Sequence, residues 1–279
     1  MDLTALLDTP PWDWPENTGK QIRKTLNNRK ADPAERLVAA ELAGDSTVID
    51  DDMANALLAI LRNKEESEEI RARAAISFGP ALEMAFTEAD EELEEFDDPE
   101  MVPISYGQFR SIQDTLRRVY DDPSTPKQVR RRILEGSVRS PEPWHVDAIR
   151  EAYATGDQEW VLTAVFAMRY VDGFDEETLE ALKSSDPEIH LEAVRAAGTG
   201  ELDPAWPHIF SLAQDETIDK DLRFAAIEAI GSIRPEEAEP YLLELSGSDD
   251  EELSEAAEEA LSYIVHDEDD EDDEDEEEL

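Results

Sequence analysis

The chain has 279 residues, of which 72 are Asp or Glu and 25 are Lys or Arg, so its formal net charge is −47 at pH 7. Such a surface repels nucleic acid and anionic membranes, and it favours basic partners or high solubility. The absence of cysteine excludes disulfides, thiol chemistry and cysteine-ligated zinc sites. No apolar run reaches the roughly 18 residues of a membrane span, and the N-terminus carries acids where a signal peptide needs positive charge. We therefore expect a soluble, cytoplasmic protein.

Residues 1–31 are predicted to form an N-terminal cap. A short helix candidate is followed by the sequence PPWDWP, in which the prolines end the helix and the indoles of Trp12 and Trp14 need an apolar surface. We expect both rings to lie against the first repeat, and the alternative is a peptide-type docking motif. The segment Thr18–Lys30 is predicted to be a helix that carries five bases and no acid.

A repeated helix pattern occupies residues 32–265. Asp32-Pro33 predicts the start of the first full repeat, because Asp is a favoured N-cap and Pro suits the first helical position. The clearest copy of the repeated helix is Asp221–Pro235, in which five residues from Ala226 read as small, apolar, any, small, apolar. The same signature starts at Ala164, Ala193 and, more weakly, Ala257, and looser copies start at Ala39, Ala74 and Ile133. A period of roughly 30–40 residues predicts stacked helix pairs, each of which needs neighbours to bury its apolar face.

The period is interrupted once, between Ala74 and Ile133. The extra length lies near residues 86–103, which hold nine acids and no base. We expect a solvated acidic loop there, and the alternative is a helical extension that carries Leu93 and Phe96. Long insertions in repeat proteins lie at one edge and are often functional.

The C-terminal repeats are short and regular. We expect Leu222–Ile233 to pair with Glu236–Leu245, and the last helix, Asp250–Val265, to be a polar end cap with exposed glutamates. Residues 266–279 include 12 acids. Because such a segment cannot bury apolar surface, we predict a disordered acidic tail.

The helical pattern resembles HEAT repeats, in particular the short HEAT-like type found in phycobilisome lyases and in bacterial scaffold proteins. The resemblance covers about residues 32–265 and is clearest in Gly156–Val265. It implies an all-α, armadillo-like protein: a right-handed α-solenoid of about six to seven HEAT-like helix pairs. The family includes adaptors, regulators and a few enzymes, so the resemblance does not define a function.

A basic segment, Arg110–Arg139, is the sharpest local departure from the acidic composition, with eight bases against four acids. Its bases are Arg110, Arg117, Arg118, Lys127, Arg130, Arg131, Arg132 and Arg139. One interpretation is ion pairing with acids of neighbouring repeats, and exposed pairs of this kind contribute little individually. The other is an anion-accepting patch for an acidic peptide, a phosphate group or the protein's own tail.

No catalytic or metal-binding motif is evident. The four histidines, His145, His190, His208 and His266, lie in different repeats, and the sequence has neither an HExxH motif nor a Gly-rich phosphate loop. His190 and His208 are close enough along the repeats to meet, although a packing or surface role is expected. We therefore predict no catalytic residue, no metal and no cofactor.

The leading functional hypothesis is a non-enzymatic scaffold or adaptor that binds another protein along the solenoid groove, and the net charge favours a basic partner. The first alternative is a bilin-lyase-like HEAT enzyme or chaperone, although no chromophore-handling motif is matched. The second is a nucleic-acid-binding HEAT-like protein. The net charge disfavours it, because phosphate contacts supply most non-specific affinity, and only the islands Lys20–Lys30 and Arg110–Arg139 support it. The sequence leaves the oligomeric state open.

Overall fold

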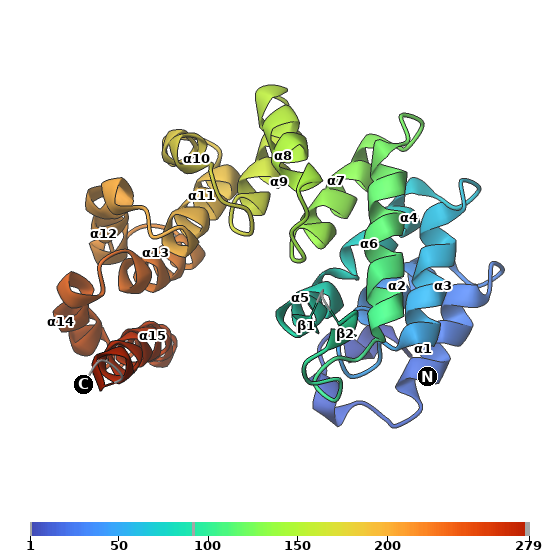
Figure 1. The fold of residues 1–279 in the computed structure, drawn as a ribbon, viewed down its shortest axis with the longest axis horizontal. Coiled ribbons are helices and arrows are strands. Elements are labelled where there is room, and N and C mark those ends of the chain that lie inside the picture. The colour runs from blue at the N-terminus through green and yellow to red at the C-terminus, as the bar shows by residue number, and fades with distance from the viewer. Residues whose placement is uncertain (1, 91–92, 277–279) are drawn as a thin grey trace. The chain divides into compact units, whose positions relative to one another are not determined.

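The computed structural model describes residues 2–90 and 93–276, with side chains described as far as Ile264. Within these residues the chain is α-helical, apart from three short 3-10 helices and one pair of two-residue strands (Figure 1). The predicted all-α class is therefore confirmed. The chain divides into two compact units, Met1–Ala148 and Ile149–Leu279. Across the described part of the chain, no helix combines the length and the apolar character needed to cross a membrane.

Unit 1 consists of two layers of helices. The helices α1, α3 and α6 form one layer, and α2, α4 and α7 form the other, so that α1 packs on α2, α3 on α4 and α6 on α7. The bounds are η1 Thr4–Leu6, η2 Pro11–Asp13, α1 Thr18–Asn27, α2 Pro33–Leu42, α3 Asp51–Arg62, α4 Glu68–Ile76, α5 Gly79–Thr87, α6 Tyr106–Asp121 and α7 Lys127–Ser137. The next helix, α8 (Trp144–Ala154), crosses the division between the units.

The helices begin where local chemistry favours it. The carboxylate of Asp32 accepts a hydrogen bond from the backbone N–H of Ala34 at 2.8 Å, and that of Asp50 accepts one from Met53 at 2.7 Å. Both residues are N-caps of the kind that satisfy otherwise unpaired N–H groups. The predicted helix start at Asp32-Pro33 is confirmed.

An arginine recurs near the start of the second helix of a pair. Its side chain hydrogen-bonds to the C-terminal end of the first helix of that pair. In each case its Nε donates to a backbone carbonyl ten residues earlier, at a helix C-terminus that has no intrahelical donor for that oxygen. The Nε–O distances are 3.3 Å for Arg36 to Leu26, 2.9 Å for Arg71 to Leu61 and 3.0 Å for Arg223 to Ala213. These arginines fix the turn between the two helices of a pair.

In its described part, the insertion near residues 86–103 consists of the end of α5, one pair of two-residue strands and irregular backbone. Strands β1 (Ala89–Asp90) and β2 (Glu95–Phe96) pair antiparallel, with Ala89 opposite Phe96. Phe96 is buried and contacts the ring of Tyr106 edge-on at a centroid distance of 5.5 Å, whereas Leu93 is 63 % exposed. The expected acidic loop is therefore found, anchored by one aromatic side chain, and the alternative helical extension is not.

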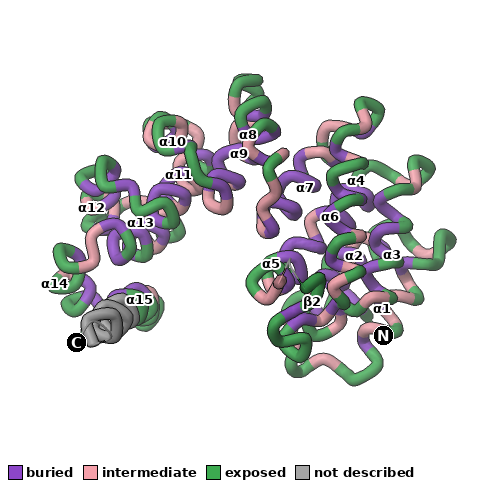
Figure 2. The backbone as a smooth tube through the Cα atoms, viewed as in Figure 1, coloured by how far each residue is buried: buried purple, intermediate pink, exposed green. Residues whose placement is uncertain are grey.

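Unit 2 repeats the two-layer arrangement. The helices that carry the repeated signature, α9, α11, α13 and α15, pack one against the next, while α10, α12 and α14 each pack on the helix that follows them. The bounds are α9 Gln158–Ala167, α10 Asp175–Ala181, α11 Pro187–Thr199, η3 Asp203–Ala205, α12 Trp206–Gln214, α13 Lys220–Ile233, α14 Pro235–Leu245 and α15 Glu251–Glu276. Ala164, Ala193 and Ala226 are fully buried, as predicted for small residues at helix contacts. Buried segments alternate with exposed ones along α11 and α13 (Figure 2).

The pairing of helices is offset by one helix from the sequence prediction. The helix α13, expected to pair with the segment after it, also touches α14 but packs more extensively on α12. Likewise α1, assigned from sequence to the N-terminal cap, is the first member of the first pair. The described residues thus form six helix pairs, which agrees with the six to seven pairs predicted from the sequence. Periodicity reveals the length of a repeat but not the position at which the repeat begins.

The helix α15 ends the succession of signature helices. Leu253, Ala257 and Ala260 are buried against the preceding helices, while Glu251, Glu252, Glu255 and Glu259 are exposed. The polar end cap is therefore found. The described backbone continues as α15 to Glu276, while residues 277–279 and the side chains beyond Ile264 lie outside the description, so the disorder expected of residues 266–279 stays a prediction.

Two signature helices approach each other closely at Gly198. A Cβ atom at this position would lie 2.7 Å from the Cβ of Ala229 and 2.9 Å from its Cα. By contrast, a Cβ added to Gly107, in the first turn of α6, would meet no atom within 4 Å. Gly198 is therefore required by packing, whereas Gly107 is not.

We expect Gly198→Ala to lower the free energy of unfolding by about 1–2 kcal/mol, because an overpacking penalty of about 1–3 kcal/mol exceeds the gain of about 1 kcal/mol in helix propensity. Gly107→Ala has the propensity gain alone, and we expect it to stabilise the protein by up to about 1 kcal/mol. Urea denaturation followed by circular dichroism measures both changes. A Gly198→Ala protein as stable as the parent would show that α11 and α13 can separate without cost.

Candidate functional site

The N-terminal segment places its two indoles in different surroundings. The Nε1 of Trp14 donates to the backbone carbonyl of Thr9 at 2.8 Å, and the ring is half-buried. Trp12, in η2, is 80 % exposed, and none of the residues of η2 is buried. The prediction that both rings lie against the first repeat is wrong for Trp12, which is exposed, and for Trp14, whose N–H is bonded within its own segment, it stays a prediction.

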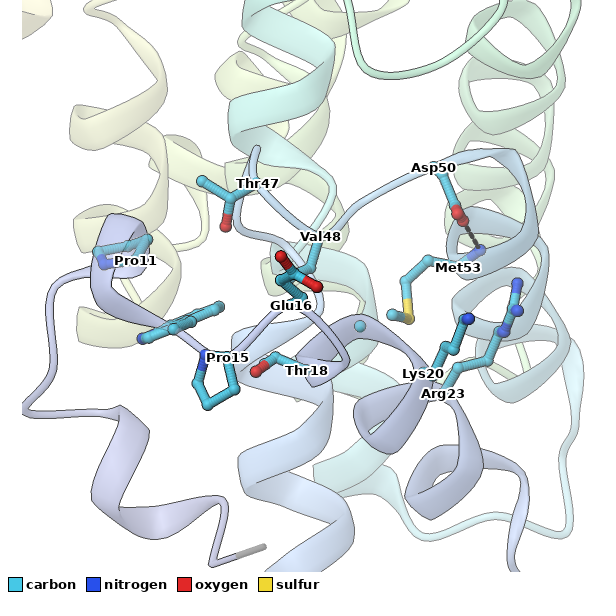
Figure 3. A pocket seen from close by; sticks show the side chains of 12 residues that line it. Pro11, Pro15, Glu16, Thr18, Lys20, Arg23, Thr47, Val48, Asp50 and Met53 are labelled. Atoms are coloured by element: carbon cyan, nitrogen blue, oxygen red, sulfur yellow. Dashed lines mark hydrogen bonds between the residues drawn. The ribbon is translucent and has the colours of Figure 1, made fainter.

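A cavity of about 310 Å³ lies beside Trp14, between the N-terminal segment, the start of α1 and the loop before α3 (Figure 3). Trp14, Val48 and Met53 give it apolar walls, and Lys20 and Arg23 lie side by side at one edge. Its full lining is Pro11, Trp14, Pro15, Glu16, Thr18, Gly19, Lys20, Arg23, Thr47, Val48, Asp50 and Met53. The volume is within the range of small binding pockets.

A second cavity, of about 450 Å³, shares Pro11 and Trp14 with the first as lining residues. It is bounded by the ends of α2 and α4, and Leu7, which is 44 % exposed, is among its apolar lining residues. Its full lining is Leu6, Leu7, Thr9, Pro11, Trp14, Glu41, Leu42, Gly44, Asp45, Arg73, Ile76, Ser77, Pro80 and Arg139. We call the two cavities, together with the segment Pro11–Trp14 that carries the exposed Trp12, the N-terminal surface.

Several charged groups at the N-terminal surface are engaged in ion pairs or hydrogen bonds. Asp50 accepts from the backbone of Met53, and Arg23 pairs with Asp52. At the second cavity, Arg73 lies 3.6 Å from Glu41, and Arg139 lies 2.6 Å from Glu83. The surface thus offers apolar walls with a charged rim, an arrangement suited to holding an apolar side chain of a polypeptide.

The eight bases of the predicted patch do not form one continuous surface. Arg131 is buried and lies 3.8 Å from Glu135, a buried acid that also pairs with Arg132. Arg139 pairs with Glu83 on α5, as described above. The other contacts are Arg110 to Gln113 at 2.7 Å, Arg117 to Asp121 at 3.9 Å, Arg118 to Thr115 at 3.3 Å and Arg130 over the ring of Tyr120 at 4.7 Å, while Lys127 is half-buried in the first turn of α7. The interpretation as ion pairs therefore describes Arg117, Arg131, Arg132 and Arg139.

One further arginine, which the sequence reasoning missed, lies beside Arg118. The Nη2 of Arg62, at the end of α3, donates to the hydroxyl of Thr115 at 2.7 Å, and the Nη2 of Arg118 donates to the same oxygen at 3.3 Å. Arg62 lies far from the basic segment in sequence, and only the packing of α3 on α6 brings the two together.

The two histidines expected to be neighbours do meet. Nε2 of His190 lies 3.0 Å from Nε2 of His208, with ring centroids 5.3 Å apart. Burial lowers the pKa of His190, and the charge of His208 acts in the same direction. One N–H···N hydrogen bond between the two rings accounts for the contact. Among the described side chains, no group of three or more His, Asp or Glu is placed to hold a metal ion.

Comparison with known families identifies the repeat. Residues 176–262, from α10 to α15, match the HEAT repeats family. This part of the chain, less than half of its length, contains HEAT repeats. The chain is similar to two solved structures: human deoxyhypusine hydroxylase in complex with glycerol (16 % identity, 95 % of this chain and 88 % of that chain, TM-score 0.40) and YibA of Escherichia coli (17 %, 93 % and 91 %, 0.45). A search of curated proteins finds no match. The finer likeness to phycobilisome lyases stays a prediction.

Proposed function

We propose that this HEAT-repeat protein is a non-enzymatic, cytoplasmic scaffold or adaptor, and that it binds a partner protein at the N-terminal surface. The observation that carries the proposal is the exposure of Trp12, 80 %, in the chain between Pro11, which lines both cavities, and Trp14, which lines both as well. Burial of an exposed indole by another chain is favourable in free energy, because it removes apolar surface from water.

The physical chemistry of interfaces supports this choice. Tryptophan is enriched among the few residues that carry most of the binding energy in protein complexes, because its ring buries a large area with little loss of side-chain freedom. Stacked helical repeats also present extended surfaces to partners. The charge of −47 favours a basic partner overall.

The test compares Trp12→Ser with Tyr263→Ser. Tyr263 is an exposed aromatic residue on α15, 54 % exposed, and so provides a matched control. We expect Trp12→Ser to weaken partner binding about tenfold, since loss of a central indole contact costs roughly 1–2 kcal/mol. Both variants should keep the parent's circular dichroism spectrum, because exposed substitutions change stability by about 0.5 kcal/mol or less.

The measurement is quantitative affinity capture with immobilised full-length protein, followed by titration of the captured partner against each variant. Equal affinity of the partner for Trp12→Ser and for the parent would reject the N-terminal surface as its binding site. Measured turnover of a substrate without any protein partner would reject the scaffold function itself.

A further inference from the structure

Arg62 and Arg118 carry two positive charges that share one neutral acceptor. Each Nη2 is bonded to the hydroxyl of Thr115, at 2.7 Å and 3.3 Å, so the two Nη2 atoms lie no more than about 6 Å apart. Thr115 is buried, 1 % exposed, while both arginine side chains are exposed. The arrangement fixes one edge of each guanidinium and leaves the other N–H donors facing solvent.

The two acids that follow Arg118 in the chain are engaged by other bases, while Asp114, one helical turn before it on α6, is exposed. Asp122 accepts from Lys64 at 2.7 Å and from the hydroxyl of Ser124 at 2.7 Å, and these hydrogen bonds hold the pKa of its carboxyl well below its usual range. Asp121 lies 3.9 Å from Arg117. The chain has nearly three acids for each base, 72 to 25, yet the described contacts place none of them on the Arg62–Arg118 pair.

The layer that carries this pair is locally basic. The helix α1, which packs on α3, has exposed Lys20 and Lys24 and contains no acid. Two like charges at this separation repel each other, and an anion placed between them would relieve that repulsion. Guanidinium groups also match the geometry of a carboxylate, which accepts two parallel N–H donors.

We propose that the Arg62–Arg118 pair accepts carboxylates from an acidic segment of a partner protein. The inference rests on the proposed protein-binding function and names the chemistry of one local segment of a partner whose surface as a whole is expected to be basic. An acidic polypeptide segment is favoured over nucleic acid, because a long polyanion would extend beyond this layer over a chain whose net charge is −47.

The experiment measures binding of a fluorescein-labelled oligoglutamate peptide of about ten residues to the full-length protein by fluorescence anisotropy at low salt, where screening is weak. We expect Arg62→Gln/Arg118→Gln to weaken binding about tenfold or more, the loss typical of charge-assisted hydrogen bonds. Lys183→Gln/Lys220→Gln removes two exposed bases from unit 2 and should change the affinity less than about twofold. Arg62→Lys/Arg118→Lys, which keeps the charge without the forked donors, should give an intermediate affinity.

Three results would overturn the inference: no peptide binding to the parent protein at low salt, equal losses in the two Gln double variants, or an effect of the arginine pair on inorganic phosphate or a single-stranded oligonucleotide but not on the peptide. Trp12→Ser should leave peptide affinity unchanged, because Trp12 lies in η2 and not on α3 or α6. A negative result in the arginine test would therefore reject the arginine site and not the proposed binding at the N-terminal surface. A negative result in the Trp12 test would reject binding at the N-terminal surface and not carboxylate binding by the arginine pair.

Discussion

Replacing Arg36 by Met is expected to lower the free energy of unfolding by about 3 kcal/mol, because it breaks a largely buried ion pair and leaves the partner groups without donors. Arg36 is 8 % exposed, and its guanidinium bonds Glu66 at 2.7 Å and 3.0 Å and the carbonyl of Leu26 at 3.1 Å and 3.3 Å. One side chain thus closes the end of α1 and holds the turn after α3.

Arg29→Met provides the control, because Arg29 pairs with the same acid. Its Nε lies 3.7 Å from Glu66, but its side chain is 71 % exposed, and we expect a loss below about 1 kcal/mol. Urea denaturation of the full chain gives both values, and hydrogen exchange should show faster exchange in α1 and α2 only for Arg36→Met. Similar losses in the two variants would mean that charge neutralisation of Glu66, and not the buried contacts of Arg36, sets the effect.

Lowering the pH from 6.5 to 4 is expected to remove about 3 kcal/mol of stability through His145 alone. This histidine is fully buried; its Nδ1 accepts the backbone N–H of Glu142 at 2.8 Å, and its Nε2 lies 2.9 Å from the hydroxyl of Ser137. Burial lowers its pKa to about 4, and the charge of Arg117 acts in the same direction. Both contacts are those of a neutral ring.

The sign follows from proton binding. Between pH 6.5 and 4 the unfolded state carries a proton on this ring and the folded state does not, so stability falls as pH falls, by about 1.4 kcal/mol per pH unit. His145→Gln is expected to be less stable at neutral pH but to lose less stability on acidification. Chemical denaturation between pH 6.5 and 5, where most carboxylates stay ionised, measures the difference in slope. Identical slopes for the variant and the parent would show that His145 is not the titrating group.

Local sequence chemistry was sufficient to predict the helices and the repeat. The spacing of Ala164, Ala193 and Ala226 identified the faces that are buried, and Asp32-Pro33 identified a helix start that its N-cap hydrogen bond confirms. These signals lie within one or two helical turns, because helix periodicity and capping are properties of neighbouring residues. For the same reason the acidic loop could be located, since it interrupts the period.

The candidate sites could be predicted only in part. Trp12 and Trp14 are the same residue type in the same short segment, so the sequence could not tell them apart. In the structure, the N–H of Trp14 is bonded to the carbonyl of Thr9, whereas Trp12 is exposed. The basic segment was found as a run of charge. Its division into buried Arg131 and exposed Arg118 depends on the side of its helix on which each residue lies and on what packs there.

The sequence by itself determined that this is an all-α repeat protein with small residues at its helix contacts and acids over its surface. Tertiary structure alone decided which helix pairs with which, and that Arg62 of α3 meets Arg118 of α6 on one hydroxyl. The physical reason is the distance along the chain over which each interaction acts. Helix formation and apolar periodicity are encoded within a few residues, whereas the partner of a charged side chain is set by elements that are distant in the chain and become neighbours only when the layers pack.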